Sequence, residues 1–212
     1  MLHLHHVLPT PLAGLAPDDS QLWLHDITFQ PAHSYLIHAA SGRGKSSLCS
    51  FLVGHRHDYQ GTITLHDTDI ATFSPARWTL LRQREVAILW QDLRLFPELT
   101  ALDNIRLKND LTHHQTPQRI HAWLDALDMT PHLDRPVRTL SYGQQQRVAF
   151  VRALCQPFSL FLADEPISHL DDTNAATLAT ILADEAAHQG ATIITTSIGR
   201  HLPLAYHHSL AL

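Results

Sequence analysis

The chain has 212 residues, 44% of them hydrophobic, and a formal net charge of −5 at pH 7. This length suits one domain with a substantial core, and the negative charge argues against a general nucleic-acid binder, which needs a basic surface. No apolar run approaches the about 18 residues that span a bilayer, and no signal peptide is visible, so we expect a cytoplasmic protein without direct membrane insertion.

Alternating apolar and polar residues predict an antiparallel β edge in the first part of the chain. Residues 1–8 alternate, a Pro-rich loop follows, and residues 21–29 alternate again. Residues 61–66 add a further alternating strand. A period of two is typical of strands with one buried face. Trp23 lies within the second of these stretches, and we expect it to be a packing residue.

A glycine-rich loop at residues 41–47 follows a short apolar run and precedes a helix expected over Ser46–Val53. Phosphate oxygens need a concave set of backbone N–H donors, which such a loop and the start of a helix supply. Lys45 then stands where it can hold the β- and γ-phosphates of a nucleotide, and the Ser46 hydroxyl can be a ligand of Mg²⁺. Ala39 occupies the first position of the pattern, where glycine is usual. The predicted nucleotide-binding residues are Ala39, Ser41, Gly42, Arg43, Gly44, Lys45, Ser46 and Ser47.

Helix-patterned sequence occupies the middle of the chain. After a buried strand expected at Val86–Trp90 comes Gln91, and helical patterning follows up to a second motif. Within Pro117–Leu127, apolar side chains recur on one helical face. The second motif, Leu-Ser-Tyr-Gly-Gln-Gln-Gln-Arg at residues 140–147, places a serine where it can cap a helix. Backbone amides at a helix start also suit a phosphate, so the cap and the phosphate site are compatible interpretations.

Two acids follow a short apolar strand expected at Ser159–Ala163. Ligands of open α/β sheets bind at the carboxyl ends of strands, so Asp164 and Glu165 are expected to face the phosphates. Asp164 would position Mg²⁺, directly or through water, and Glu165 would activate the attacking water as general base. A solvated acidic pair before a turn is the alternative interpretation. The remaining expected elements, in βαβ order, are a helix at Asp172–Gln189 and strands at 191–196 and 205–212.

The order of these motifs resembles that of ATP-binding-cassette proteins. The string at residues 140–147 resembles the family signature Leu-Ser-Gly-Gly-Gln, with Tyr142 in place of the first glycine. Gln91 resembles the Q-loop glutamine, and Ser168–Asp171 resembles the D-loop. The stretch Leu-Ala-Asp-Glu-Pro-Ile-Ser-His-Leu-Asp-Asp at 162–172 is similar to the branch that contains lipoprotein-releasing, macrolide-export and cell-division ATPases.

The resemblance implies an α/β fold, with a P-loop NTPase (RecA-like) core, an antiparallel β edge and an inserted helical subdomain. Residues 1–212 would form one nucleotide-binding domain, with its core at 1–91 and 157–212 and the helical subdomain at about 92–156. In this family the signature of one subunit completes the ATP site of another. The implied roles are Ser46, Gln91 and Asp164 at Mg²⁺, Glu165 in catalysis, Asp171 in the D-loop, and Ser141, Gly143 and Gln144 at the partner's ATP.

The function implied by the resemblance is ATP binding and hydrolysis, with ATP and Mg²⁺ as cofactors. Dimerisation driven by ATP would power a membrane transporter or a membrane-coupled mechanical complex. The partners would be separately encoded transmembrane subunits and either a second copy or a paired ATPase subunit. The protein would then be peripheral on the inner face of the plasma (inner) membrane, and nucleic acid is not an expected partner.

Two positions depart from the family pattern. Ser197 stands where a switch histidine normally bonds the γ-phosphate, and His201 would substitute only if its segment were helical and faced inward. An ATP-binding switch with slow or absent hydrolysis is therefore the alternative function. The aromatic residue that stacks on adenine is replaced by Pro11 or Pro17, depending on the alignment of the first strands.

Overall fold

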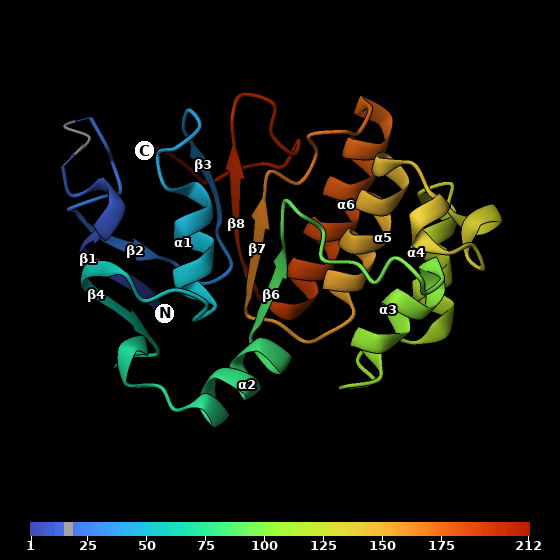
Figure 1. Cartoon of the computed structure of the whole chain (residues 1–212), viewed down its shortest axis with the longest axis horizontal. Helices are drawn as coiled ribbons and strands as arrows, with labels where there is room; N and C mark the ends of the chain where they lie inside the picture. Colours follow the sequence, from blue (N-terminus) through green and yellow to red (C-terminus); the bar gives the residue numbers. More distant parts are fainter. Residues whose placement is uncertain (15–18) are drawn as a thin grey trace.

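The computed structural model describes residues 1–14 and 19–212, which form two β-sheets with helices packed around them (Figure 1). One sheet is antiparallel, with strand order β2-β1-β4-β5, and the other is parallel, with order β6-β7-β8-β3-β9. The predicted antiparallel β edge is confirmed and forms a sheet of its own, although one of its strands is shorter than expected. The strands are β1 (Leu2–Pro9), β2 (Asp26–Phe29), β3 (Ser34–His38), β4 (Tyr59–Leu65), β5 (Thr68–Asp69), β6 (Val86–Leu89), β7 (Leu160–Asp164), β8 (Thr192–Ser197) and β9 (His208–Ala211).

The helices occupy the connections between these strands. Within the described residues the α-helices are α1 (Lys45–Leu52), α2 (Pro75–Arg84), α3 (Ala101–Asn109), α4 (Pro117–Ala126), α5 (Tyr142–Leu154) and α6 (Asp172–Gln189). Short 3₁₀ turns are η1 (Thr10–Leu12), η2 (Ile70–Thr72), η3 (Thr130–His132) and η4 (Val137–Thr139). The bounds predicted for α6 are confirmed. In the structure Asp171 caps its start, and Gly190 adopts the left-handed conformation at its end.

Both faces of the parallel sheet are covered, as its continuous apolar strands require. In β7, Phe161 and Ala163 belong to the core shared with α3 to α6, whereas Leu160 and Leu162 belong to the core shared with α1 and the antiparallel sheet. Alternate residues of β7 thus face opposite sides of the parallel sheet, and α1 lies on the side that faces the antiparallel sheet. The carboxyl ends of β3 and β7 therefore open beside the start of α1.

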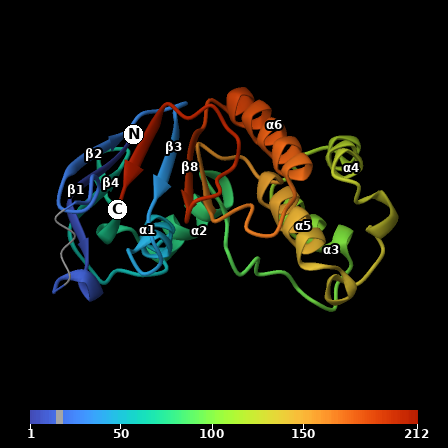
Figure 2. The same ribbon diagram turned by 90° about the horizontal axis from the view of Figure 1, so that it is seen from above.

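Helices α3, α4 and α5 lie on the far side of the parallel sheet from the antiparallel sheet (Figure 2). The predicted apolar face of α4 is buried through Ile120, Trp123 and Leu124. Thr100 and Thr116 cap α3 and α4 by accepting a backbone N–H with their side-chain oxygens. Over the described residues, none of the helices has both the length and the apolar character needed to cross a membrane.

The strand expected at residues 21–29 is shorter than its pattern suggested. It begins only at Asp26, because a turn precedes it. The Ser20 hydroxyl accepts the backbone N–H groups of Leu22 and Trp23, at 3.2 and 2.8 Å, and Leu24 has a φ of 63°. Trp23 therefore lies in a turn and not in a strand.

Candidate nucleotide site

The glycine-rich loop connects β3 to α1, and Trp23 packs against it. Gly44 caps α1 with a φ of 96°, and a Cβ atom there would lie 3.1 Å from both Leu12 and Trp23 side-chain atoms. The Trp23 indole N–H donates to the Arg43 carbonyl at 3.0 Å. Because Trp23 is only 1% exposed, it supports the loop and has no free face for a base. Its predicted packing role is confirmed.

The Lys45 ammonium occupies the hollow of this loop. Its Nζ donates to the carbonyl oxygens of Ala39 and Ala40, both at 3.0 Å, and lies 3.8 Å from Glu165 Oε1. Burial lowers the Lys45 pKa, against the opposing effect of the charges on Glu165 and Asp164. The Ala39 N–H donates to the Ser197 carbonyl at 3.1 Å. Ala39 thus extends the β3–β8 pairing while its carbonyl holds the lysine.

The two acids stand at the carboxyl end of β7 as predicted, Asp164 as its last residue and Glu165 directly after it. Thr196 on the neighbouring strand β8 contacts both of them. The Thr196 hydroxyl donates to Asp164 Oδ1 at 2.6 Å and accepts the Glu165 N–H at 3.2 Å. Glu165 has a φ of 50°, a left-handed conformation that costs a residue with a side chain about 1–3 kcal/mol. A strained backbone conformation of this kind persists where surrounding contacts hold it. Here the conformation directs the Glu165 side chain toward Lys45. Thr196 was not among the predicted site residues, because only the pairing of β8 with β7 brings it to the acids.

A cavity of about 280 Å³ lies over the loop. Gln91 reaches it from the end of β6 and donates from Nε2 to Glu165 Oε2 at 3.3 Å. A neighbouring hollow of about 280 Å³ is lined by Ser46, Gln91 and Asp164, the three predicted Mg²⁺ ligands. Hydroxyl, amide and carboxylate oxygens are donors that suit this hard cation. The residues lining the first cavity are Pro9, Pro11, Leu12, Ser41, Gly42, Gly44, Lys45, Ser46, Ser47, Arg56, Gln91, Glu165 and Ile198.

The signature lies at the start of α5, well separated from the start of α1 (Figure 2), and none of its residues lines this cavity. Ser141 and Gln144 form a reciprocal cap, in which each side chain accepts the backbone N–H of the other residue, at 3.3 and 2.9 Å. A Cβ atom on Gly143 would lie 3.0 Å from the His169 carbonyl of the D-loop, so this position favours glycine. Asp171 caps α6, and the hydrogen bonds it accepts from Asn174 lower its pKa.

Tyr142 connects the signature to two other motifs. Its hydroxyl donates to the Gln91 carbonyl at 2.8 Å, and its ring meets the His169 ring edge-on at a centroid distance of 4.3 Å. The side chain that replaces the usual glycine therefore contacts both the Q-loop and the D-loop of its own chain.

Ser197 ends β8 and is buried, with 1% of its surface exposed. Its hydroxyl donates to the Arg200 carbonyl at 2.7 Å, and Ile198 instead lines the cavity. The Arg200 guanidinium in turn donates to the Leu170 carbonyl at 2.8 Å and to Asp172 at 2.6 Å, which joins this segment to the D-loop and to the start of α6. His201 is exposed on a segment without helical structure, so the condition for its substitution is not met. Of the two prolines considered for the base, Pro11 lines the cavity and Pro17 lies outside the described residues.

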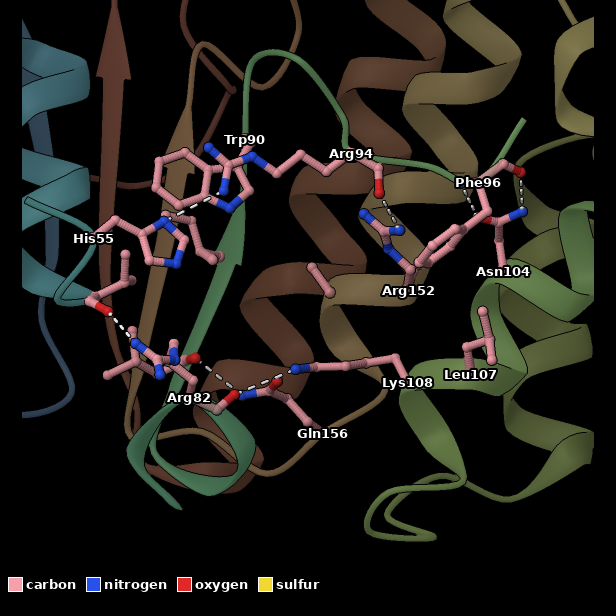
Figure 3. A pocket seen from close by; sticks show the side chains of 14 residues that line it. His55, Arg82, Trp90, Arg94, Phe96, Asn104, Leu107, Lys108, Arg152 and Gln156 are labelled. Carbon is pink, nitrogen blue, oxygen red and sulfur yellow. Dashed lines mark hydrogen bonds between the residues drawn. The ribbon is translucent and has the colours of Figure 1, made fainter. Parts of the chain in front are cut away.

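A third hollow, of about 320 Å³, is lined by residues of β6, α3 and α5, among others (Figure 3). Phe96 and Leu107 line it and are 56% and 46% exposed. Arg152 donates to the Leu93 and Arg94 carbonyls at 2.6 and 2.7 Å, and burial lowers its pKa to about 10. Among the described lining residues there is no carboxylate, whereas the cations are Arg82, Arg94, Lys108 and Arg152. We call this hollow the cationic groove.

Comparisons with known proteins agree with this geometry. Residues 24–168 match the family model described as ABC transporter. The lipoprotein-releasing system ATP-binding protein LolD of Nitratidesulfovibrio vulgaris is 29% identical over 180 residues, which cover 84% of this chain and 77% of that protein. LolD of Alcanivorax borkumensis is 31% identical, covering 75% and 71%. The uncharacterized ABC transporter ATP-binding protein Rv0986 of Mycobacterium tuberculosis is 32% identical, covering 85% and 73%.

Solved structures show the same fold. The ATP-binding cassette MJ0796, in a dimeric post-hydrolysis state bound to ADP and Pi, superposes with a TM-score of 0.76 at 22% identity, covering 93% of this chain and 88% of that one. Another dimeric structure of MJ0796 gives a TM-score of 0.77 over 92% and 88%. The predicted P-loop NTPase fold is thus confirmed. With its motifs, its fold and its relatives in agreement, the chain belongs to the ABC transporter family of ATP-binding proteins.

Proposed function

We propose that this chain is the ATP-binding and ATP-hydrolysing subunit of a membrane transporter or membrane-coupled mechanical complex, and that ATP drives its dimerisation. The supporting observation is that the chain has both a P-loop cavity and a signature, but no residue of the signature lines the described cavity, and only the Tyr142 hydroxyl reaches its margin, at the Gln91 carbonyl. A head-to-tail pair would bring each signature to the other chain's cavity. On this proposal residues 1–212 form one nucleotide-binding domain, with a core at 1–91 and 157–212 and a helical subdomain at 92–156.

The proposed reaction uses groups that are already close together. Mg²⁺, when bound at Ser46, Gln91 and Asp164, would neutralise charge on the phosphates. Lys45 Nζ, which now donates to two loop carbonyls, would donate to phosphate oxygens instead. Glu165 would accept a proton from the attacking water, because Thr196 fixes its backbone and Gln91 its carboxylate.

The partner's signature would complete the site. The exposed Ser141 side chain and the amide of Gly143, at the positive end of the α5 dipole, suit a γ-phosphate. The subunit would then act from the cytoplasmic face of the inner membrane, under separately encoded transmembrane subunits. A second candidate function, an ATP-binding switch with slow hydrolysis, is favoured by the engagement of the Ser197 hydroxyl with Arg200.

Mixing two inactive variants tests the composite site. Lys45→Ala removes the P-loop cation, and Ser141→Arg blocks the signature, so each variant alone should lack hydrolysis. In a mixed dimer one of the two sites has both an intact P-loop and an intact signature. An equimolar mixture should therefore recover about a quarter of wild-type hydrolysis per chain, measured with radiolabelled ATP under single-turnover conditions.

The matched control mixes Lys45→Ala with Glu165→Gln. Both changes lie on the P-loop side of a site, so every site in a mixed dimer keeps one defect and no activity should return. Recovery in this control, or no recovery in the first mixture, would contradict the head-to-tail arrangement.

We also propose that the cationic groove receives a segment of the transmembrane subunit that presents carboxylates between apolar side chains. Exposed Phe96 and Leu107 supply apolar contacts, and the nearby Lys108 and Arg152 supply charge. These two cations donate to backbone carbonyls, and neither has a carboxylate within 4.0 Å among the described residues. A carboxylate from a partner would therefore find unpaired, partly desolvated charge.

The groove proposal predicts a charge-dependent interaction. A fluorescein-labelled amphipathic helical peptide with two glutamates should bind, by anisotropy, at least about fivefold tighter than its glutamine counterpart. Lys108→Glu should abolish that difference. Arg106→Glu, on the same helix but outside the groove lining, should leave it unchanged. Equal binding of the two peptides, or equal effects of the two variants, would contradict the proposal.

A further inference from the structure

The nucleotide cavity has two chemically different ends. At one end lie Lys45, Gln91 and Glu165, the groups suited to the terminal phosphates. At the other end lie Arg56 and the apolar wall of Pro9, Pro11 and Leu12. If the phosphates occupy the first end, the base and ribose must extend toward the second.

Arg56 is held in place at that second end. Its Nη1 donates to Ser47 Oγ at 3.0 Å, in the first turn of α1, and its Nε donates to Asp58 Oδ1 at 2.8 Å. A second bond joins Arg56 Nη2 to Asp58 Oδ2, so the pair is bidentate. The guanidinium carbon also lies 5.6 Å from the centre of the Phe51 ring. With these contacts in place the Arg56 side chain is still 38% exposed, and Arg56 lines the cavity.

The loop that holds Arg56 is joined to the opposite wall. The Thr10 N–H donates to the Asp58 carbonyl at 2.8 Å, and Pro9 pairs with Tyr59 across β1 and β4. The turn η1, with Pro11 and Leu12, therefore has a fixed position relative to Arg56. A flat group between them would contact apolar side chains on one side and a guanidinium plane on the other.

Among the described residues, no aromatic side chain lines this part of the cavity. Trp23 is buried with its N–H bonded to Arg43, and Tyr59 packs against Phe51 at a centroid distance of 4.8 Å. In sequence, residues 15–18 are Leu, Ala, Pro and Asp, which add no ring.

We propose that Arg56 forms the base-binding wall of the nucleotide site, with its guanidinium plane stacked on the ring of a purine nucleoside triphosphate. This assignment rests on the proposed function, because it takes the cavity as an ATP site. Planar, weakly hydrated guanidinium groups stack well on flat rings, and bases offer a π-face whatever their edges. Arg56 thus takes the role of the aromatic residue that would otherwise stack on the base.

The test compares two ligands that share phosphates but differ in the base. Mg²⁺-ATP and Mg²⁺-tripolyphosphate are titrated by calorimetry into wild type and Arg56→Ala. The variant should bind ATP about five- to tenfold more weakly and tripolyphosphate unchanged. Asp58→Asn, which keeps Arg56 but loosens its anchor, should give a smaller loss in the same direction.

Arg77→Ala is the matched control. Arg77 also pairs with a carboxylate, Glu85 at 2.6 Å, and lies 5.5 Å from the centre of the Phe73 ring, but it does not line the cavity. Its loss should leave both affinities unchanged. Equal losses for ATP and tripolyphosphate in Arg56→Ala would place the guanidinium on a phosphate and overturn the stacking assignment, as would unchanged ATP affinity. Failure of the wild type to bind either ligand would instead contradict the proposed function.

Discussion

Replacing Lys45 by alanine is expected to abolish ATP binding at micromolar nucleotide. The Lys45 ammonium is the only lysine or arginine charge in the described lining of the cavity at its Glu165 end. Charge-assisted hydrogen bonds from this group to two phosphates are worth about 3 kcal/mol together, which corresponds to about a hundredfold in affinity. The loss should exceed that of Arg56→Ala, and it should affect ATP and tripolyphosphate alike.

Ligand-induced thermal stabilisation measures this loss. Mg²⁺-ATP should raise the melting temperature of the wild type and leave that of Lys45→Ala unchanged, because a ligand stabilises only a fold that it binds. Circular dichroism without nucleotide shows whether the variant is folded. A folded variant whose melting temperature still rises with micromolar ATP would mean that the loop is not the phosphate site.

Replacing Ser197 by histidine is expected to raise ATP hydrolysis at least about tenfold. A hydrogen bond to a charged transition state is commonly worth about 2–4 kcal/mol, or roughly thirty- to a thousandfold in rate. In the present structure the Ser197 hydroxyl donates to the Arg200 carbonyl, and the adjoining cavity wall is the aliphatic side chain of Ile198. An imidazole at position 197 is longer than the serine side chain and would supply a donor at the end of β8, next to that wall. The measurement is phosphate release under conditions that favour the dimer.

Ser197→Ala separates catalysis from packing. It removes the bond to Arg200 without adding a donor, so it should change the hydrolysis rate less than about twofold. A rapid wild-type rate that histidine leaves unaffected would contradict the proposed degenerate switch. A large decrease in the alanine variant would show that the serine hydroxyl itself takes part in hydrolysis.

Local motifs predicted the phosphate-binding half of the site because their chemistry depends on neighbouring residues in sequence. The strand, the loop and the helix around Gly44 are continuous, and the two acids stand at the carboxyl end of a fully buried strand, whose last residue is Asp164. The parallel order of these strands then brings Lys45 to Glu165, as expected for open α/β sheets.

Contacts between segments that are far apart in sequence could not be predicted from local sequence patterns. Thr196 acts on Asp164 only because β8 pairs with β7, and this pairing leaves no periodic signal in either strand. Arg56 lies in an ordinary surface loop by sequence, and only the β1–β4 pairing brings that loop to the cavity. The prediction of a strand around Trp23 was wrong for a different reason. Side-chain hydrogen bonding from Ser20 favoured a turn over the alternation of the apolar residues.

The hydroxyl of Tyr142 makes the resting orientation of the helical region energetically preferred. Any rotation that carries the start of α5 away from β6 must break the 2.8 Å bond to the Gln91 carbonyl and separate the ring from His169. One such bond contributes about 1 kcal/mol net, or about a fivefold shift in population. A glycine at this position would allow the same rotation without that cost. Any exchange between such orientations would therefore be biased toward the one observed, by a residue outside the described lining of the nucleotide cavity.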